Sequence, residues 1–404
     1  MTVGIIGAGA SGMAAALAAS ENASVNVILM ERQTRVGRKL QATGNGRCNL
    51  SNTHAALGGY HGEEPDFVIP AIEAFSPEAT LQWFADLGLY TVTEESGKVY
   101  PYSDQANSVV DVLRLNLNKP NICLKLGFEV EKVQKTDTGF VVKGNEKSVT
   151  CDKLIVACGG LAGSKLGGTM SGYKLFAKLG HKATKLRPSL VQIKTSWGAI
   201  SALKGVRANC RVQILRNGNL FAESTGELQF TEQGISGPVV FEISRDVCYG
   251  AGEWTAKLDF LPDLTEEQLC KMIQSRRASD LPMEELLTGI LQNRLGRVLT
   301  KAAGVKGKDF ARELSNREAE ELCRVMKSLK ISLTEPLGMD SAQVTAGGVL
   351  TAQFNENTME SRIVPGLYAC GEVLDIDGDC GGYNLQWAWS SGRMAGLNAG
   401  KESK

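Results

Sequence analysis

Three glycines near the N-terminus have the spacing of a phosphate-binding turn. Gly7, Gly9 and Gly12 come directly after a short apolar run. The first glycine lets the chain turn sharply out of a strand, the second lets a pyrophosphate approach the backbone, and the third lets a helix lie close to a sheet. The free N–H groups at the start of that helix, at Ala10 and Ser11, attract phosphate.

An acidic residue completes this pattern. Glu31 ends the next apolar run, about 20 residues beyond the glycines, where a carboxylate accepts hydrogen bonds from ribose hydroxyls. The elements that must position these groups are a strand at 3–6, an Ala-rich helix at 13–19 and a strand at 25–30. We therefore predict a dinucleotide site rather than a structural glycine turn, and this stretch alone leaves the choice of dinucleotide open.

A long basic segment follows the acid. Residues 32–52 are polar and rich in glycine, and they carry Arg35, Arg38, Lys39 and Arg47. Loops of this length in compact domains are usually functional or disordered. Arginine neutralises a pyrophosphate with a bidentate fork, so we predict ligand contact here. The alternative interpretation is a solvated basic loop.

The segment 367–392 holds a second set of polar groups. A strand ends in Gly371-Glu372, further acids follow at Asp375, Asp377 and Asp379, and Gly382 precedes a helix predicted at 385–398. The positive end of such a helix stabilises negative charge on the pyrimidine edge of a reduced flavin. An acidic loop that satisfies the helix dipole is the structural alternative. Together with the N-terminal pattern, this segment favours FAD.

Another buried strand is predicted at 154–157, because four apolar residues occur in sequence. It leads into a glycine pair, and we expect the backbone at Ala157 and Gly159 to pass close to the cofactor. The preceding runs at 122–126, 128–133, 140–143 and 148–150 are short, and we interpret them as one small antiparallel piece.

A chain of 404 residues suggests two or three domains. The sequence pattern of strands, glycine-rich turns and helices stops near residue 190 and resumes at 341. Between these points a β-rich stretch precedes a helical one, with capping boxes beginning at Thr265 and Ser315. We predict an α/β fold with a discontinuous nucleotide domain (1–188 and 341–404), a β-rich, barrel-like insert (189–262) and a helical insert (263–340).

The charge and composition of the chain argue against some classes of partner and location. The formal net charge is zero, so no global field draws the chain to nucleic acid or membrane. The ten cysteines lack CxxC pairs and metal-ligand spacings, which predicts reduced thiols, a cytoplasmic location and no metal. The first 20 residues lack a basic region, and no run of 18 apolar residues predicts a membrane span. Residues 271–330 hold 13 Lys/Arg against 8 Asp/Glu, and we favour an ordinary charged surface over a phosphate-rich partner.

Four motifs together resemble one family of bacterial flavoproteins, labelled aminoacetone-oxidase-like or BaiN-like (3-dehydro-bile-acid reductase). They are GRKLQATGNGRCNLSN (37–52), FTEQGISGP (230–238), VTAGGV (344–349) and GEVLDIDGDCGGYNLQWAWSSGRMAG (371–396). The resemblance runs from Val3 to about Gly396. It implies a Rossmann-like FAD-binding domain of the glutathione-reductase type, interrupted by a barrel-like and helical insert.

The resemblance also implies roles for individual residues. Many related flavoproteins carry Gly-Asp where this chain has Gly371-Glu372, so the acid that meets ribitol stays open among Glu372, Asp375 and Asp377. The expected FAD-binding residues are Gly7, Gly9, Ala10, Ser11, Gly12, Glu31 and Arg32 for the adenosine half; Lys39, Thr43, Gly44, Arg47, Cys48 and Asn49 around pyrophosphate and flavin; Val130, in a strand near adenine; Ala157 and Gly159; and Gly371, Glu372, Asp377, Gly382, Tyr383, Asn384 and Leu385 along ribitol and ring.

Two side chains are candidates for catalysis. Cys48 follows Arg47, and a thiol near a cation and a flavin gains thiolate character, although a small packed residue is the favoured interpretation. Tyr383 is a candidate proton donor whose alternative role is a wall of the flavin site. His54, His61 and His181 fall in no motif, and we interpret them as structural or surface residues. Only one dinucleotide fingerprint is present, so NAD(P)H is expected, if at all, as a transient reductant.

Three functions fit this sequence. The first is an FAD-dependent oxidoreductase that transfers hydride through flavin N5, reducing an activated C=C bond in a small molecule or oxidising an amine. The second follows from members of the wider family that resemble ribosomal RNA dihydrouridine synthases, for which the basic 271–330 region would contact RNA phosphates. The third is a non-catalytic flavin-binding assembly factor.

Overall fold

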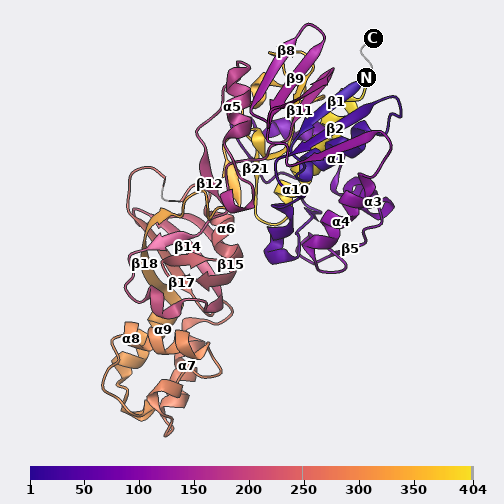
Figure 1. Ribbon diagram of the computed structural model, residues 1–404. Helices are drawn as coiled ribbons and strands as arrows, with labels where there is room; N and C mark the ends of the chain where they lie inside the picture. The colour runs from indigo at the N-terminus through magenta and orange to yellow at the C-terminus, as the bar shows by residue number, and fades with distance from the viewer. Residues whose placement is uncertain (248, 402–404) are drawn as a thin grey trace. The chain divides into compact units, whose positions relative to one another are not determined.

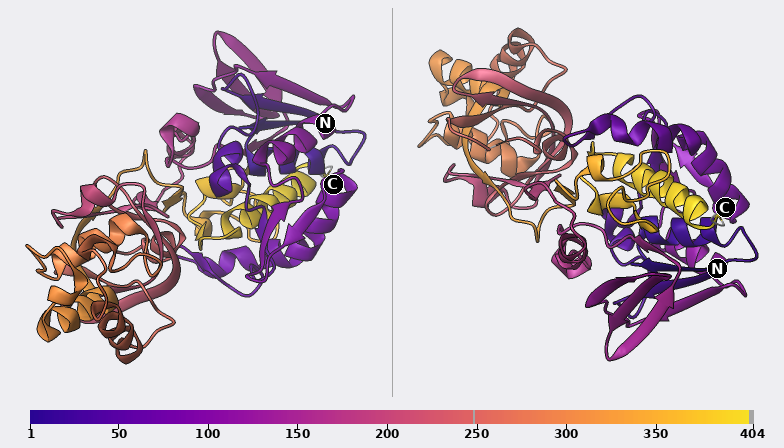
Figure 2. Two further views of the ribbon diagram at one scale, coloured as in Figure 1. Left: turned by 90° about the horizontal axis from the view of Figure 1, so that it is seen from below. Right: turned by 90° about the horizontal axis from the view of Figure 1, so that it is seen from above.

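The computed structural model describes residues 1–247 and 249–401, which divide into two compact units. One unit comprises residues 1–188 together with the chain from Gln343 onward, and the other spans Ser189–Ala342. The first unit is therefore formed by an N-terminal and a C-terminal segment of the chain. In Figure 1 and in both views of Figure 2, the yellow C-terminal segment lies among indigo and purple N-terminal elements.

A five-stranded parallel sheet forms the centre of the first unit. Its central strand β1 pairs with β11 on one side and β2 on the other. The runs 3–6 and 154–156 are fully or almost fully buried, as expected for parallel strands covered on both faces. The strand order is β20 (Leu367–Ala369), β11 (Lys153–Val156), β1 (Thr2–Ile6), β2 (Asn26–Glu31) and β7 (Ile122–Leu126).

The prediction that 122–126 belongs to an antiparallel piece is wrong. β7 pairs in parallel with β2 and forms the edge of the main sheet. Its side chains are only partly buried, so its sequence resembles that of a small exposed sheet. The antiparallel piece contains only three strands, and these are β8 (Lys132–Thr136), β9 (Gly139–Gly144) and β10 (Lys147–Cys151).

Two helices join the halves of this unit. α1 (Ala10–Ala19) and α10 (Tyr383–Ala399) pack with their backbones in close approach. A Cβ added to Gly392 would lie 2.4 Å from the Ser11 carbonyl oxygen, and one added to Gly396 would lie 2.3 Å from that of Ala15. The second contact lies four residues after the first on both helices, so α1 and α10 run in the same direction.

Smaller elements surround this core. Ser76 caps a helix in this region, since its hydroxyl accepts a hydrogen bond from the Ala79 N–H at 3.3 Å. The other elements of the unit are β3 (Ser51–Asn52), β6 (Lys98–Pro101) and β5 (Thr91–Thr93) in one sheet, the pairs β4 (Tyr60–His61) with β21 (Asp377–Gly378) and β12 (Arg187–Ser189) with β19 (Val344–Ala346), and the helices α2 (Ile69–Ala74), α3 (Pro77–Asp86), α4 (Ala106–Asn116) and α5 (Ser171–Lys178).

The second unit contains a closed six-stranded barrel. Both expected capping boxes are present, at Thr265 before α7 and at Ser315 before α9. The barrel order is β13 (Ile193–Thr195), β16 (Gly234–Ser236), β15 (Asn219–Phe230), β14 (Arg207–Arg216), β17 (Trp254–Asp259) and β18 (Leu329–Pro336), accompanied by α6 (Pro238–Ile243), α7 (Glu266–Arg277), α8 (Asn293–Ala302) and α9 (Asn316–Ser328).

The structure differs from the predicted division of this insert. β18 lies inside the stretch predicted to be helical, yet it pairs with β17 and β13 and closes the barrel. The chain thus leaves the barrel after β17, forms three helices and returns. Barrel and helices consequently form one compact unit. Within the described residues, no helix has the length and apolar character needed to cross a membrane.

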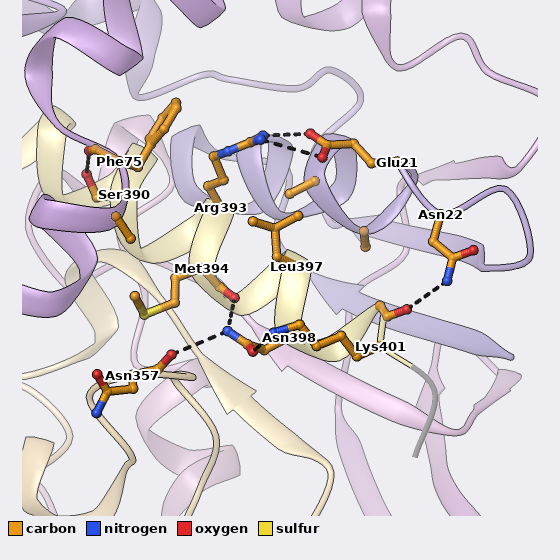
Figure 3. Close-up of a pocket in the computed structure, with 14 residues that line it drawn as sticks. Glu21, Asn22, Phe75, Asn357, Ser390, Arg393, Met394, Leu397, Asn398 and Lys401 are labelled. Carbon is orange, nitrogen blue, oxygen red and sulfur yellow. Dashed lines mark hydrogen bonds and ion pairs between the residues drawn. The ribbon is translucent and has the colours of Figure 1, made fainter. Parts of the chain in front are cut away.

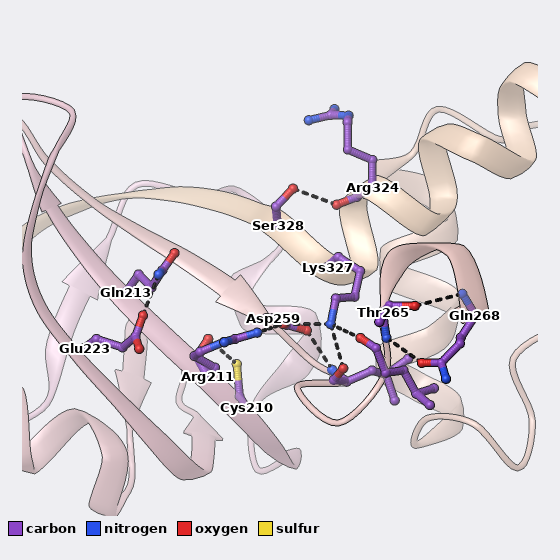
Figure 4. Close-up of polar contacts among 12 residues, drawn as sticks. Cys210, Arg211, Gln213, Glu223, Asp259, Thr265, Gln268, Arg324, Lys327 and Ser328 are labelled. Atoms are coloured by element: carbon purple, nitrogen blue, oxygen red, sulfur yellow. Dashed lines mark hydrogen bonds and ion pairs between the residues drawn. The ribbon is translucent and has the colours of Figure 1, made fainter. Parts of the chain in front are cut away.

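A buried ionic cluster fastens the helices to the barrel (Figure 4). Asp259, at the end of β17, pairs with Arg211 and with Lys327 of α9, each at 2.8 Å, and only 9% of its side chain is exposed. Lys327 also donates to the Leu261 carbonyl at 2.7 Å. Burial opposes the charged carboxylate, but the hydrogen bonds from Arg211 and Lys327 outweigh it and hold the pKa of Asp259 below its ordinary value.

This cluster predicts acid-sensitive stability. Because the folded pKa of Asp259 lies below the unfolded one, the carboxylate stabilises the fold above about pH 4, and this contribution is lost as pH falls through the folded pKa. We expect Asp259→Asn to cost roughly 1–2 kcal/mol near neutral pH, with a smaller difference from wild type below about pH 4. Urea unfolding across pH measures this. Glu321→Gln, which removes the exposed pair with Arg324, is the control and should cost much less.

Candidate cofactor and active site

The start of α1 forms an open cradle. Gly7 has φ +100°, and a Cβ on Gly12 would lie 1.8 Å from the Gly7 carbonyl oxygen, so both positions require glycine. Gly9 is the N-cap, and none of the described side chains caps the helix there. No described heavy atom lies within 4 Å of a Cβ built on Gly9. The first N–H groups of α1 therefore face open space that fits a phosphate.

The acid at the end of β2 lies beside this cradle. Glu31 accepts hydrogen bonds from the N–H groups of Ala8 and Gln33, both at 2.8 Å. These bonds hold the carboxylate against the glycine turn, which is the position expected of a ribose-binding acid. The neighbouring Arg32 donates to the Gly167 carbonyl at 2.8 Å, so its guanidinium is engaged by a loop.

The expected strand around Val130 is not where the sequence predicted it. Val130 is buried, but it precedes β8, which begins only at Lys132. The backbone from Phe128 instead follows the end of β2, since the Phe128 N–H donates to the Glu31 carbonyl at 2.8 Å. Val130 thus lies in a connecting segment near the end of β2, and its contact with adenine stays a prediction.

Two of the four cations of the basic loop, Lys39 and Arg47, lie in different environments. Lys39 turns inward and pairs with Glu372 at 2.7 Å. Arg47 pairs with Asp104 at 2.5 Å and lies over the ring of Tyr100. In the structure, Asp104 and Glu94 compensate the charge of Arg47, and its contact with a pyrophosphate stays a prediction. Lys39 lies 333 residues from its partner and links the two halves of the site.

A turn at 43–49 holds this loop in place. Gly44 has φ +57°, and a Cβ there would lie 2.9 Å from the backbone nitrogen of Asn49. The Thr43 hydroxyl donates to the Leu40 carbonyl at 2.7 Å. Thr43, Gly44 and Asn49 therefore shape the backbone, and their contact with a cofactor stays a prediction.

The structure favours the interpretation of Cys48 as a small packed residue over an activated thiolate. Cys48 is fully buried and has φ +62°. Burial raises the pKa of the Cys48 thiol to about 12, and a hydrogen bond with Thr43 offsets this only in part. Because Arg47 is turned toward Asp104, no cation lowers this pKa. The thiol is protonated at neutral pH and packs as a small apolar side chain.

We therefore expect Cys48→Ala to leave turnover of the holoenzyme within about twofold of wild type and to cost about 1 kcal/mol of stability, the price of a small buried cavity. Steady-state kinetics and urea unfolding measure the two effects. A loss of turnover at unchanged FAD occupancy and stability would return Cys48 to the reaction.

The N-terminus of α10 is a second open helix end. Gly382 has φ +105°, and a Cβ there would lie 2.3 Å from the Ser51 carbonyl oxygen. No described side chain caps the helix. Asn384 fixes the preceding loop by bonding to the N–H and carbonyl of Gly378 at 2.8 and 2.7 Å. The N–H groups of Tyr383 and Leu385 belong to the same first turn, where α-helical bonds leave donors free.

The N-termini of α1 and α10 lie at different heights along the shared direction of the two helices. Gly392 lies against Ser11, so α10 begins about eight residues, or roughly 12 Å, before the start of α1. This spacing suits an extended ligand with a pyrophosphate at one helix and an electron-accepting ring at the other.

The acids between these ends differ in exposure. Glu372 accepts from Lys39 and from the Thr345 N–H at 2.9 Å, and 19% of its side chain is exposed. Asp375 and Asp377 are buried, and Asp375 accepts from the Glu63 N–H at 3.1 Å. We therefore expect Glu372, rather than Asp375 or Asp377, to meet ribitol. Its neighbour Gly371 has φ +75° and packs against the Ser11 hydroxyl.

The loop after β11 forms another side of the cradle. A Cβ on Gly7 would lie 2.5 Å from the Ala157 carbonyl oxygen, and Gly159, with φ +70°, has no described heavy atom within 4 Å of an added Cβ. Ala157 thus lies against the glycine turn, the space around Gly159 is open, and the contact of both residues with the cofactor stays a prediction.

A polar cluster at the head of α10 was missed by the sequence analysis. His61 Nε2 lies 2.7 Å from Asp379 Oδ1, and β4 pairs with β21 to hold them together. Burial, reinforced by the charge of Asp379, raises the pKa of the Tyr383 phenol. His61 and Asp379 are 318 residues apart, so no local spacing could reveal the pair.

These residues fit FAD. The chain offers two uncapped helix ends, a cradle that only glycines permit, and acids at both ribose and ribitol positions. In addition, the hydroxyl of buried Tyr173 has no hydrogen-bond partner among the described residues. A polar ligand beside it would satisfy that group.

A cavity of about 510 Å³ at the opposite ends of the same helices is a different kind of site (Figure 3). Its walls include Ala18 and Ala19 at the end of α1 and Asn398 at the end of α10, and Arg393 pairs with Glu21 at 2.6 Å beside it. Helix C-termini present carbonyl oxygens, which disfavour phosphate. We therefore expect the cofactor at the N-terminal ends of the two helices.

Comparisons with known proteins agree with this geometry. The family model described as HI0933-like protein Rossmann domain matches residues 1–398. The 3-dehydro-bile acid delta(4,6)-reductase of Clostridium scindens is 39% identical over 98% of both chains. The ribosomal RNA dihydrouridine synthase of Escherichia coli is 34% identical over 96% of this chain and 95% of that one.

Solved structures show the same fold at lower identity. The 3-ketosteroid delta1-dehydrogenase of Sterolibacterium denitrificans has a TM-score of 0.53 with 13% identity and covers 99% of both chains. Fold and site thus define an FAD-dependent oxidoreductase with a Rossmann-type domain and a barrel insert. The chain belongs to the HI0933-like family. The predicted class, an FAD-dependent oxidoreductase, is confirmed, and this favours an enzyme over a non-catalytic assembly factor.

Proposed function

We propose that this protein is a reductase of an activated C=C bond in a small molecule, with NAD(P)H as the source of electrons. The observation that carries this proposal is the 39% identity, over nearly the whole of both chains, to a protein named as a delta(4,6)-reductase of 3-dehydro-bile acids. That name denotes a substrate whose C=C bond is conjugated with a ketone.

The names of the two relatives have one reaction type in common. Conversion of uridine to dihydrouridine also saturates a C=C bond conjugated with a carbonyl group. Saturation of such a bond requires one hydride and one proton. Bound FAD would supply the hydride chemistry, and a side chain at the site would supply the proton.

Residues at the head of α10 support this proton transfer. Tyr383 stands at the first turn of the helix, and its raised pKa keeps the phenol protonated and able to donate. The His61–Asp379 pair lies nearby and is about half exposed, so protons can reach it from solvent. Lys39 and Glu372 would hold the ribitol side, and the uncapped N-terminus of α10 would stabilise negative charge at the pyrimidine edge.

The basic character of 271–330 gives limited support to an RNA substrate. Several of its cations are compensated by carboxylates in the structure, which lowers the field available to RNA phosphates. These cations are Lys271, Arg297, Lys308, Arg312, Arg324 and Lys327. RNA nevertheless stays the second candidate, because of the 34% identity to a ribosomal RNA dihydrouridine synthase.

Product analysis separates these candidates. We expect the holoenzyme with NADH or NADPH to add two hydrogens to a 3-oxo-Δ4 steroid, detected by mass spectrometry, and expect cells lacking the gene to keep their ribosomal dihydrouridine. An aminoketone assayed for oxidation tests the amine alternative. Loss of ribosomal dihydrouridine together with an unreduced enone would overturn the small-molecule proposal and favour RNA.

A further inference from the structure

The buried hydroxyl of Tyr173 is not used by any interaction described so far. Tyr173 lies in the first turn of α5 and is 5% exposed, yet its hydroxyl oxygen finds no hydrogen-bond partner within the described part of the chain. A buried polar group without a hydrogen-bond partner destabilises the fold. Where the polypeptide offers no partner, a bound water or ligand usually supplies one.

The surroundings of α5 place this hydroxyl at the cofactor site. A Cβ added to the preceding Gly172 would lie 3.0 Å from Cys158 Cβ and 3.3 Å from a methyl group of Val373. α5 therefore packs between the loop that follows β11 and the loop that follows β20. These loops carry Gly159 and Glu372, two of the residues expected to contact FAD.

The charged groups around Tyr173 indicate which part of the cofactor lies near its hydroxyl. After burial, the strongest influence on the Tyr173 phenol is the charge of Glu372, and Cys158 and Asp375 act in the same direction, so its pKa is raised. The phenol consequently stays protonated as a hydrogen-bond donor. Glu372 and Asp375 belong to the flavin half, where a ribitol chain would pass.

We propose that the Tyr173 hydroxyl binds the ribitol chain of FAD and is a cofactor-positioning residue of this site. This inference depends on the proposed function only because it assumes that the bound cofactor is FAD. A polyol suits this position because each hydroxyl both accepts and donates, so one can accept from the phenol and donate to Glu372. An apolar ligand segment would leave the Tyr173 hydroxyl without a partner.

Tyr173→Phe tests this inference through binding and stability, without an activity assay. Because the substitution removes a hydroxyl that has no partner in the apoprotein, we expect thermal stability without FAD to be unchanged or raised. We expect FAD affinity, measured by quenching of flavin fluorescence, to fall about 5- to 12-fold, the loss of one hydrogen bond. ADP, which lacks ribitol, should bind the variant and wild type equally.

Tyr368→Phe is the matched control. Tyr368 is equally buried, but its hydroxyl bonds to Glu360. We expect this variant to lose apoprotein stability and to keep its FAD affinity, the opposite of Tyr173→Phe in both measurements.

Three results would overturn the inference. FAD affinity within twofold of wild type, together with reduced apoprotein stability, would assign Tyr173 a structural role. An equal loss of FAD and ADP affinity would place the hydroxyl on the pyrophosphate instead of ribitol. A wild-type apoprotein that binds no FAD would overturn both this inference and the proposed function, whereas the first two results leave the proposed function intact.

Discussion

Gly9→Ala is expected to leave the apoprotein folded and to weaken FAD binding by about 100-fold, or roughly 2.7 kcal/mol. Gly9 has φ −81° and ψ −166°, a conformation that alanine adopts without strain. No described heavy atom lies within 4 Å of the added Cβ, so the fold can accept it. The methyl group would occupy the space through which a pyrophosphate approaches the N–H groups of α1.

Isothermal titration of FAD into apoprotein measures this loss, and scanning calorimetry checks the fold. Gly198→Ala is the control, since its Cβ also meets open space but lies in the second unit. It should change neither measurement. Undiminished FAD affinity in a folded Gly9→Ala variant would contradict the location of the pyrophosphate at this helix.

Gly396→Val is expected to destabilise the protein by about 3 kcal/mol or more. A Cβ at this position would lie 2.3 Å from the Ala15 carbonyl oxygen, so α1 and α10 would have to separate. Helix propensity acts in the opposite direction, because any residue with a Cβ except proline is favoured over glycine within a helix. The loss can therefore be assigned to the contact between the helices.

Urea unfolding followed by circular dichroism measures this change. Leu397→Val serves as the control, because it places the same β-branched residue at an exposed position of the same helix. It should cost less than about 1 kcal/mol. A Gly396→Val variant as stable as wild type would show that the close approach of α1 and α10 is not required for the fold.

The parts of the site formed by neighbouring residues were predictable from the sequence. Gly7, Gly9 and Gly12 act through local backbone geometry, which spacing reveals directly. The same holds for the capping boxes at Thr265 and Ser315, where each cap bonds three residues away. Glycine requirements and caps are set within one turn of chain, so a single sequence is sufficient.

The parts formed by distant residues were not predictable. Arg47 lies next to glycines and looks ready for phosphate, yet it bonds to Asp104, 57 residues later. The edge strand β7 lacks the continuous apolar character of a buried parallel strand, so its direction was misassigned. β18 follows a helical stretch, and only closure of the barrel accounts for it. Each case depends on tertiary pairing, which local pattern does not encode.

The most direct test of the account is an anaerobic two-step reaction of the purified yellow protein. We predict that NADH or NADPH bleaches the flavin and that a 3-oxo-Δ4 steroid, added next without oxygen, restores the oxidised spectrum as the enone is reduced. A protein that carries no flavin, or a reduced flavin that the enone leaves bleached, would contradict the assignment of this chain as a reductase of conjugated C=C bonds.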